Sequence, residues 1–583
     1  MNQRNVLLAV VLSAVLLLGW DALVGYLYPG SRDPAGQKID TPAEQVATAT
    51  GAPVVHSRTG GLDPAAMAIE KRDLKTALAG GNRVAIDAPR VAGSINLLTG
   101  TIDDIVLKNY RETVERGSDP VRLFSPEGTP AQQFAEFGFL ANGLKLPAGP
   151  WRTDGARLTP ATPVTLTKQA GGLTYRIRFT IDNQFMLRAE QRVDNTGAVG
   201  VVVQPYALIN RTDRTASLDQ MFVHSGPMGA FGGAANYDVE YEDLAEDGPA
   251  APKGAVNWTG FTDIYWLSAL VPQPGAQATA GYRALGNTLY RADLIYAPVT
   301  LAPGSAISRS TQLFAGAKEA RVLDAYEAAG IPQFSRAIDW GWFRWFIRPF
   351  LWLLQTLFAF AGNFGVAIIL LTVVVRALLF PIAQKGFASM AAMKAIQPKM
   401  KELQARHKDD KLKQQQEMQK LFKDEGVNPL AGCLPLLLQA PILYALYKVF
   451  VLAIDMRHQP FALWIRDLSA PDPAMILNLF GVLDFTPPSF LGIGVLAVLL
   501  GVTMWLTFKL NPAPADPVQQ QMFAIMPWIL MFAMAPFAAG LLLYWITSNV
   551  LTIAQQKYLY AKHPQLRKAV EEERAAAKAA AEG

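Results

Sequence analysis

The sequence predicts an α-helical polytopic membrane bundle of about six spans, joined to an all-β sandwich domain that lies outside the cytoplasm. Two observations lead to this fold class. Apolar residues are concentrated in 6–28 and in 340–560, whereas 30–330 has the composition of a water-soluble domain. Within 61–330, short segments alternate apolar and polar side chains with the period of two that is typical of strands in an antiparallel sandwich.

The first expected element is an N-terminal membrane anchor at 1–28. Its apolar run, 6–27, is longer than the core of a typical signal peptide, and no cleavage site of small residues follows it closely. About 20 apolar residues suffice to cross a bilayer, so we expect an uncleaved span that starts in the cytoplasm. The segment 29–60 is rich in Pro, Gly, Ala and Thr, which predicts a flexible tether.

The β domain is expected at 61–330. The segments 173–181 and 185–193 show the alternation of apolar and polar residues most clearly, and Gly, Pro, Asn and Asp punctuate such runs. A helix is expected near the end of this domain, at 317–329. It should stop at Gly330, because glycine readily adopts the left-handed conformation that closes many helices.

An amphipathic helix on the membrane surface is expected at 331–362. Tryptophans and arginines are interleaved here, and this mixture is typical of interfacial helices. The simpler alternative is that the segment only begins a span. However, the apolar run 350–382 is too long for one helix, and Gly362-Asn363 offers a break within it.

The remaining elements are expected to alternate between spans and loops. The final two spans, around Pro536-Phe537, should form a tight hairpin of short helices. The expected order is a second span at 363–382, a cytoplasmic helical hairpin at 383–428, a third span at 429–453, a periplasmic loop at 454–488, a fourth span at 489–508, a cytoplasmic loop at 509–521, a fifth span at 522–537, a sixth span at 538–558 and a tail at 559–583.

The distribution of basic residues predicts how the chain is oriented in the membrane. The hairpin 383–428 carries ten lysines and arginines, whereas the loop 454–488 has only Arg457 and Arg466 against four aspartates. The positive-inside rule therefore places the hairpin, the tail and both termini in the cytoplasm, and the β domain on the opposite side. The basic tail could also contact anionic lipid or RNA, but a solvated helix face is the interpretation we favour.

The sequence offers little for covalent catalysis. Cys433 is the single cysteine and has apolar neighbours, and His224 is the only histidine of the β domain. There is no phosphate-binding GxxxxGK[ST] motif, no CxxC and no HExxH. We therefore expect no enzymatic activity, no metal site and no cofactor, although pairs of carboxylates in the β domain leave a sugar-active site open.

Arg376 is the clear anomaly of the membrane part. It lies about 10 Å inside the second span, if that span ends at Ile382. A guanidinium cannot be neutralised by deprotonation, and its burial costs at least ~2.5 kcal/mol. The interiors of the other apolar spans contain no Asp or Glu that could pair with it. Two solutions remain: the side chain reaches the membrane surface, or it faces a water-filled groove between helices.

Other polar and aromatic residues recur at helical spacing in the same spans, which favours the groove. Such residues normally face the interior of a bundle, where they either hold helices together or line a cavity. The candidates are Thr372 in the second span, Gln439, Tyr444, Tyr447 and Lys448 in the third span, and Tyr544, Trp545, Ser548, Asn549 and Thr552 in the last span.

Several motifs, in this order along the chain, resemble the YidC family of membrane protein insertases in its Gram-negative form. They are 372–381, 396–399, 428–435, 460–468, 516–520 and Ser548-Asn549. The resemblance implies a bacterial inner-membrane protein with a hydrophilic groove that is centred on Arg376 and open to the cytoplasm. It also implies that helices of inserted proteins slide along Thr372 and Tyr544. Relatives often have a second tyrosine where this chain has Trp545.

The same resemblance implies the partners. These are nascent inner-membrane proteins, the Sec translocon, ribosome–nascent chain complexes and membrane lipids, with no specific nucleic-acid site. The cytoplasmic hairpin is the implied contact for ribosome-bound chains, with Lys394, Lys399, Lys401 and Lys413 as candidates. The outer domain of the family resembles a sugar-epimerase sandwich.

The function expected from the residues and the resemblance together is insertion, folding and assembly of inner-membrane proteins, alone or with the Sec translocon. Two alternatives belong to other classes. A polytopic transporter would usually need carboxylates inside the membrane for coupling, and none is evident. A protein that binds or processes envelope sugars would act through the β domain.

Overall fold

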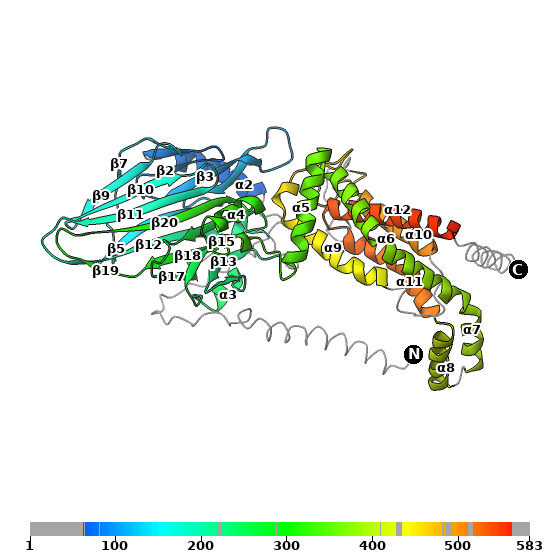
Figure 1. Ribbon diagram of the computed structural model, residues 1–583. Coiled ribbons are helices and arrows are strands. Elements are labelled where there is room, and N and C mark those ends of the chain that lie inside the picture. Colours follow the sequence, from blue (N-terminus) through cyan, green and yellow to red (C-terminus); the bar gives the residue numbers. More distant parts are fainter. Residues whose placement is uncertain are drawn as a thin grey trace. The chain divides into compact units, whose positions relative to one another are not determined.

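The computed structural model describes residues 62–562 except 63, 81, 218–222, 287, 408–409, 427–433, 481–482, 484–491 and 511–516. The expected anchor 1–28, tether 29–60 and most of the tail 559–583 therefore lie outside the described residues. The chain divides into two compact units, Met1–Asp339 and Trp340–Gly583. Figure 1 labels the elements of both units.

The first unit contains two large β-sheets. All strand pairs are antiparallel except β1 with β8. The first sheet runs in the order β17 (Ala278–Ala284), β18 (Leu289–Tyr296), β12 (Val201–Thr212), β5 (Gln133–Ala141), β3 (Ile102–Arg111), β2 (Val91–Asn96), β1 (Arg83–Asp87) and β8 (Arg157–Leu158), with β19 (Val299–Leu301), β4 (Pro120–Phe124) and β6 (Leu144–Lys145) paired beside β12, β3 and β5. The second sheet runs in the order β14 (Ala234–Asn236), β13 (Gly226–Phe231), β15 (Val256–Thr262), β16 (Trp266–Val271), β20 (Ala306–Ala317), β11 (Met186–Asn195), β10 (Leu173–Ile181), β9 (Val164–Ala170) and β7 (Arg152–Thr153).

The core of this unit lies between the two sheets. Phe137 of β5 packs edge-on against Phe179 of β10, with ring centroids 5.7 Å apart. Phe139 of β5 and Tyr175 of β10 make a second contact across the sheets at 5.2 Å. All four side chains are almost fully buried. Because aromatic residues of both sheets alternate inward in this way, the predicted all-β sandwich is confirmed.

Short helices border the sandwich. The helix expected at 317–329 begins later in the structure, at Ala320, because Ala317 belongs to β20 and pairs with Trp266 of β16. Its end agrees with the prediction: Gly330 has φ +107°, and the N–H of Ile331 donates to the carbonyl of Tyr326 at 3.1 Å. The helical segments are α2 (Pro64–Ala79), η2 (Asp213–Thr215), α3 (Tyr241–Glu246), α4 (Ala320–Ala328) and η3 (Phe334–Ala337).

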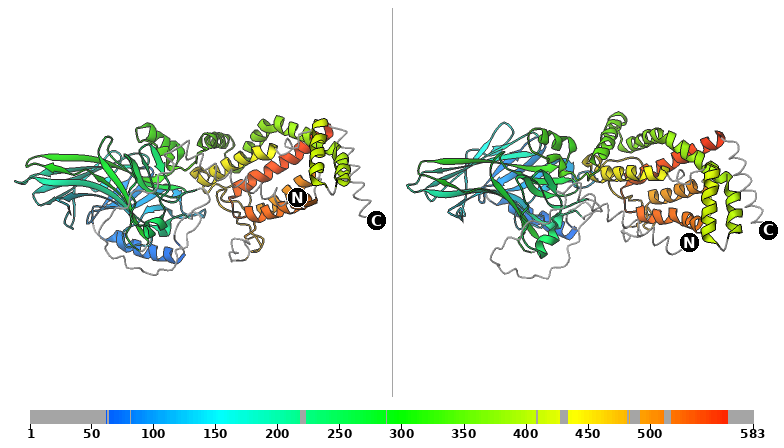
Figure 2. Two further views of the ribbon diagram at one scale, coloured as in Figure 1. Left: turned by 90° about the horizontal axis from the view of Figure 1, so that it is seen from below. Right: turned by 60° about the horizontal axis from the view of Figure 1, so that its bottom comes forward.

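The second unit is helical in its described part. Helix α12 packs against α6 and α10, α10 packs against α11, and α5 packs against α6 and α9. In two further views, the orange and red helices α10, α11 and α12 run side by side (Figure 2). The helical segments are α5 (Arg344–Ala361), α6 (Phe364–Ala395), α7 (Gln397–Arg406), α8 (Lys411–Asp424), α9 (Leu434–Leu452), η5 (Ile454–Met456), α10 (Val495–Leu510), α11 (Pro517–Met534) and α12 (Ala539–Lys562).

The break between α5 and α6 occurs at Gly362-Asn363. Gly362 adopts a left-handed conformation with φ +66°, and its N–H donates to the carbonyl of Phe358 at 2.8 Å. Asn363 begins the next helix, since its side-chain oxygen accepts the N–H of Val366 at 3.1 Å. Helix α5 buries Ile347, Leu351 and Leu354 and exposes three tryptophans near or on it, as an amphipathic helix does. The exposed tryptophans are Trp342, Trp345 and Trp352.

Helix α6 contains the expected second span and the first part of the expected hairpin. The span was expected at 363–382 and the helical hairpin at 383–428, and in the structure one helix passes through Pro381 and continues to Ala395. A proline removes only one helical hydrogen bond, and the alanine-rich segment after it favours helix. The helix therefore continues past Pro381.

Length and apolar character identify candidate spans. Among the described residues, one helical stretch, Phe364–Gly386, is long and apolar enough to cross a membrane. Shorter apolar stretches are Leu438–Leu452, Val495–Leu510 and Gln521–Met534. The six-span count thus remains a prediction.

Asp472 anchors the connection between α9 and α10. Its carboxylate is almost fully buried and accepts three N–H groups: the indole of Trp464 at 2.9 Å, and the backbone N–H groups of Ala474 at 3.0 Å and Leu496 at 2.8 Å. The last of these lies at the start of α10. A carboxylate at that position satisfies an otherwise unpaired helical donor and interacts favourably with the helix dipole.

Candidate functional site

Arg376 lies near the middle of α6 and points toward α12. Its Nε donates to Oγ of Ser548 at 3.0 Å, and its Nη2 donates to the same oxygen. Ser548 is fully buried, and Arg376 is half-buried. In the described part of the chain, no carboxylate lies within ion-pairing distance of this guanidinium. The charge is therefore held in place by a neutral hydroxyl, and its other N–H groups remain for water or a bound chain.

Helix α12 places its polar residues on one face by spacing alone. Tyr544, Ser548 and Thr552 follow each other at intervals of one turn. The hydroxyl of Thr552 donates to the carbonyl of Ser548 at 2.7 Å. On α6, the buried hydroxyl of Thr372 likewise donates to the carbonyl of Ile368 at 2.7 Å, one turn before Arg376. Each of these hydroxyls donates its hydrogen bond within its own helix. They therefore place polar oxygen atoms near Arg376 without a hydrogen bond to a neighbouring helix.

Tyr544 ties α12 to α9. Its hydroxyl accepts a hydrogen bond from Nε2 of Gln439 at 2.8 Å, and the tyrosine is almost fully buried. The turn from Tyr544 to Ser548 thus bonds to α9 through one residue and to α6 through the other. Two polar contacts one turn apart fix three helices around Arg376.

The structure separates other predicted residues from this centre. Asn549 donates to the hydroxyl of Thr503 in α10 at 3.2 Å, so it holds two helices together beside the groove residues. The ring of Tyr447 packs edge-on against Phe537 at 5.9 Å, and the ring of Tyr444 lies 6.0 Å from Phe343. Lys448 is buried in α9, and Trp545 is half-buried on α12.

Thr503 is the residue that the sequence analysis missed. It is one polar side chain in the apolar helix α10, and it also donates to the carbonyl of Leu499 in its own helix at 2.8 Å. Thr507 follows one turn later, but two threonines whose hydroxyls donate to carbonyls of their own helix do not indicate a partner helix. Only its packing opposite Asn549 shows that it joins α10 to α12.

Lys399 and Lys413, the two candidate lysines of the hairpin whose side chains the structure describes, make separate contacts. Lys399 of α7 forms an ion pair with Glu425 beyond α8, with the charged atoms 2.5 Å apart. Lys413 lies in the first turn of α8, where its backbone N–H donates to the capping carboxylate of Asp410 at 3.0 Å. The side chains of Lys394 and Lys401 lie outside what the structure describes.

The two helices pack on each other through a small apolar cluster. Ile396 and Met400 are buried against Met418, Leu421 and Phe422 of α8. Around this cluster the surface is charged, and the pair α7–α8 is held by few apolar side chains.

Metal-ligating residues do not gather in the described part of the protein. No group of three or more His, Cys, Asp or Glu side chains there is arranged to hold an ion. The residues around Arg376 present a fixed cation among hydroxyl, carboxamide and aromatic groups. A cation in such surroundings can attract carbonyl and carboxylate groups.

Comparisons with known proteins show which families this chain resembles. Residues 83–353 match the family model described as the YidC periplasmic domain, and residues 356–566 match the model described as 60Kd inner membrane protein. Curated proteins named membrane protein insertase YidC from Beijerinckia indica subsp. indica and from Zymomonas mobilis subsp. mobilis are each 40% identical to the chain, with 96% of both chains covered. A solved structure described as an active YidC insertase with its first transmembrane domain resolved is 17% identical, with a TM-score of 0.36, over 82% of this chain and 92% of that chain.

Proposed function

The chain belongs to the YidC family of membrane protein insertases, and on that premise we propose that it inserts its clients through a hydrophilic groove centred on Arg376. It is an insertase and not an enzyme, an inner-membrane protein with a periplasmic domain, and its clients are inner-membrane proteins. The transporter and sugar-processing alternatives are not favoured, because the full-length relatives are named insertases.

One observation carries the proposal of the groove. Arg376 is held by the hydroxyl of Ser548, and within the described residues no carboxylate neutralises it. A structural ion pair would bury both charges together, because an unpaired charge in lipid is costly. A guanidinium that is positioned but not neutralised fits a wet groove in which the missing anion or carbonyl arrives with the client.

The mechanism needs no nucleotide. The polar outer segment of a client rests in the groove beside Arg376 while the apolar helix that follows it moves into lipid. Each CH₂ group that leaves water contributes about 0.8 kcal/mol, so a helix of ordinary composition supplies the driving force. An acidic group 4 Å from Arg376 would gain about 4 kcal/mol before desolvation at an effective dielectric constant of about 20. Attraction of that size holds a segment briefly and then releases it.

The proposed topology has six spans with both termini in the cytoplasm. The apolar helices α6, α9, α10, α11 and α12 supply five of these spans, and the anchor 1–28 supplies the first. The distribution of basic residues supports this orientation, because the segment 383–428 is strongly basic and the segment 454–488 is not. The sandwich of the first unit is the periplasmic domain, and the hairpin α7–α8 lies in the cytoplasm.

The proposed partners follow from this orientation. The charged hairpin α7–α8, with Lys394, Lys399, Lys401 and Lys413, contacts ribosome–nascent chain complexes. The exposed tryptophans at α5 contact lipid at the membrane surface. The chain works alone or beside the Sec translocon.

The test uses two matched clients that differ only in the charge of the translocated segment, one acidic and one neutral. Arg376→Lys should retain much of the insertion, Arg376→Ala should fail most with the acidic client, and Arg376→Glu should fail worst. Lys385→Glu is the matched control, because Lys385 is an exposed cation on the same helix. Insertion is measured as protection of the translocated segment from added protease. Equal losses for both clients would show that Arg376 maintains the fold or hydration of the groove and does not attract client charge.

A further inference from the structure

The connection between α9 and α10 exposes apolar side chains that the groove does not explain. We call its described residues between 454 and 483 the outer connection. Among them, the exposed fractions of six large apolar residues range from 43% at Ile476 to 89% at Leu463. A group of exposed apolar side chains of this kind marks a surface that contacts a partner or a membrane. The six residues are Leu463, Ile476, Leu477, Leu479, Phe480 and Leu483.

Two acidic side chains of the outer connection are turned inward. The carboxylate of Asp472 is almost fully buried and accepts three N–H groups, as described above. The carboxylate of Asp467 accepts the backbone N–H groups of His458 at 3.1 Å and of Ser469 at 2.8 Å, and its side chain is 15% exposed. Acidic groups thus lie inside and large apolar groups outside, which is the reverse of a loop in water.

Three of the exposed apolar residues have a left-handed backbone. The angle φ is +56° at Leu463, +51° at Leu479 and +63° at Phe480. Glycine adopts this conformation without steric cost, whereas a large side chain there is uncommon. A turn that only reversed the chain in water would be better served by glycine at each position. The large apolar side chains therefore indicate that the side chains themselves have a role.

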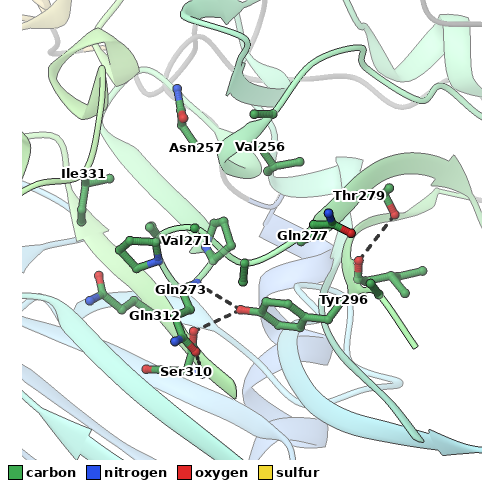
Figure 3. A pocket seen from close by; sticks show the side chains of 18 of the residues that line it. Val256, Asn257, Val271, Gln273, Gln277, Thr279, Tyr296, Ser310, Gln312 and Ile331 are labelled. Carbon is green, nitrogen blue, oxygen red and sulfur yellow. Dashed lines mark hydrogen bonds between the residues drawn. The ribbon is translucent and has the colours of Figure 1, made fainter. Parts of the chain in front are cut away.

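A connection in the sandwich shows the usual choice of residues for a loop in water. The segment 272–277 joins β16 to β17 and lines a cavity of the first unit (Figure 3). Its left-handed residue is Gly275, with φ +75°, and its exposed side chains include Gln273 and Gln277. Glycine removes the steric cost of the turn, and carboxamides form hydrogen bonds with water. The outer connection has large apolar residues both at left-handed positions and on its surface.

Leu463 is held at the tip of a closed turn. The N–H of Phe461 donates to the carbonyl of Ile465 at 3.0 Å, and the N–H of Ile465 donates to the carbonyl of Ala462 at 3.1 Å. A methyl group added at Gly365 would lie 2.0 Å from the ring of Phe461, so the turn packs directly on the first turn of α6. Hydrogen bonds within the turn suit lipid surroundings, because hydrocarbon offers no partner to a backbone donor.

The second apolar turn, at 475–480, is joined to the start of α10. The N–H of Val495, the first residue of α10, donates to the carbonyl of Ala474 at 3.1 Å, and the N–H of Phe480 donates to the carbonyl of Met475 at 2.8 Å. Helix α10 is one of the apolar stretches described above, and it carries exposed apolar side chains of its own. These are Leu499, Val502, Trp505 and Leu506. The apolar surface of the turn therefore begins at the end of a candidate span.

We propose that the outer connection is a lipid-binding surface, and that Leu463 and Phe480 insert among the acyl chains of the leaflet at the outer end of α10. Its junction with an apolar helix favours lipid over a soluble partner. Arg466, three residues after Leu463, is exposed, and a long basic side chain beside inserted apolar groups can reach the lipid phosphates. The assignment to the periplasmic leaflet rests on the proposed topology, whereas the contact with acyl chains does not.

This lipid contact bears on the groove through two hydrogen bonds. Nδ2 of Asn363, at the start of α6, donates to the carbonyl of Phe461 at 3.0 Å. The N–H of Gly540, in the first turn of α12, donates to the carbonyl of Leu468 at 2.8 Å. The outer connection thus holds the ends of the two helices that carry Arg376 and Ser548. Its depth in the leaflet sets the depth at which these helices end.

The test measures the surroundings of single labelled positions in the full-length chain in phosphatidylcholine nanodiscs. Cys433→Ser removes the single cysteine, and Leu463→Cys or Phe480→Cys then carries a bimane label. The fluorescence is quenched either by bromine atoms on the acyl chains of the lipid or by iodide in the water. Leu144→Cys is the matched control, because Leu144 is a leucine of β6 in the first unit and is 72% exposed. Val502→Cys, at an exposed position of α10, is the reference for contact with lipid.

We expect brominated lipid to quench the label at 463 and at 480 at least about fivefold more than at 144, and iodide to show the reverse order. Strong quenching by iodide at either position would overturn the proposal. Protection from iodide without quenching by brominated lipid would also overturn it, since a second copy of the chain or another protein would then cover the surface. Arg376→Ala should leave the quenching unchanged while failing in insertion of the acidic client, so failure of either proposal is seen separately.

Discussion

The guanidinium of Arg376 in α6 donates from both Nε and Nη2 to a single oxygen, Oγ of Ser548 in α12. Hydrogen bonds to a charged group contribute about 1.5–3 kcal/mol, so this contact helps to fix the direction of the guanidinium. Because Ser548 is fully buried, no water can replace its hydroxyl without a change in packing.

Ser548→Ala should therefore lower insertion of an acidic client several-fold while leaving the helices assembled. The guanidinium would lose its fixed direction, and its charge would be less available to the client. Thr547→Val is the matched control, since the hydroxyl of Thr547 donates to the carbonyl of Leu543 in its own helix at 2.8 Å and makes no other hydrogen bond to a described residue. Insertion is measured by protease protection. Similar losses in both variants would assign the effect to α12 itself and not to Arg376.

Tyr544→Phe should destabilise the bundle by about 0.5–1.5 kcal/mol, because it removes the hydroxyl that accepts from Gln439. The ring remains, so insertion should stay near normal, whereas Tyr544→Ala should reduce both stability and insertion. A double-mutant cycle of Tyr544→Phe with Gln439→Leu, read by denaturant unfolding in micelles, isolates the pair. Strictly additive effects would show that the two residues touch without stabilising one another.

Removal of residues 62–338 should leave insertion near normal. The first unit has its own sandwich core and ends at Asp339, so a deletion that stopped at 310 would leave half of β20 exposed. The expected product keeps the anchor, the tether and α5. Protease protection of a client in cells that depend on the shortened chain is the measurement. A stably folded deletion with no insertion would show that the sandwich takes part in the essential step.

The hairpin α7–α8 should exchange its amide hydrogens at least about tenfold faster than α12, because little apolar surface holds it. Replacing 396–425 with a Gly/Ser linker should abolish insertion without changing the unfolding temperature of the bundle. Hydrogen exchange followed by mass spectrometry reads the first effect. Slow exchange in α7 and α8 of the isolated protein would contradict the mobility that we expect.

His458 should titrate below its ordinary value of 6.5. Burial of the imidazole lowers its pKa first, the nearby charge of Arg457 lowers the pKa further, and Asp467 opposes both. Between the lowered pKa and 6.5, the unfolded chain binds more protons than the folded chain, so stability falls as the pH drops through that window. Asp467→Asn removes the opposing charge and should lower the pKa again. NMR of ring-labelled histidines measures it, with His458→Gln as the assignment control, and a pKa above 6.5 would refute the prediction.

The sandwich could be predicted because the alternation of apolar and polar residues that marks a strand is visible within a short stretch of sequence. The expected strand at 173–181 is β10, since its apolar side chains had to face one side. The start of α4 was wrong, because Ala317 favours helix by its own propensity, whereas its pairing with Trp266 of β16 depends on a distant part of the chain. The sequence did not show that one helix joins the expected span to the expected hairpin, because Pro381 signals a stop only where the following residues do not favour helix.

The same limit applies to the groove. The period of the polar residues on α12 predicted that Tyr544 and Ser548 share a face, and Arg376 was conspicuous by its charge. The bond between Gln439 and Tyr544 and the bond between Asn549 and Thr503 depend on how each helix is rotated against its neighbour. That rotation follows from packing of the whole bundle, and no spacing within one helix encodes it.

Asp472 has a mechanical consequence that its hydrogen bonds alone do not suggest. Its carboxylate accepts hydrogen bonds from the indole of Trp464 and from Leu496 in the first turn of α10. A movement of α10 is therefore coupled to Trp464. If α10 turns about its axis, it either breaks the bond to Leu496 or carries Trp464 with it. Because Thr503 further along α10 is bonded to Asn549, such a turn would also strain the contact with α12, the helix whose Ser548 hydroxyl holds Arg376.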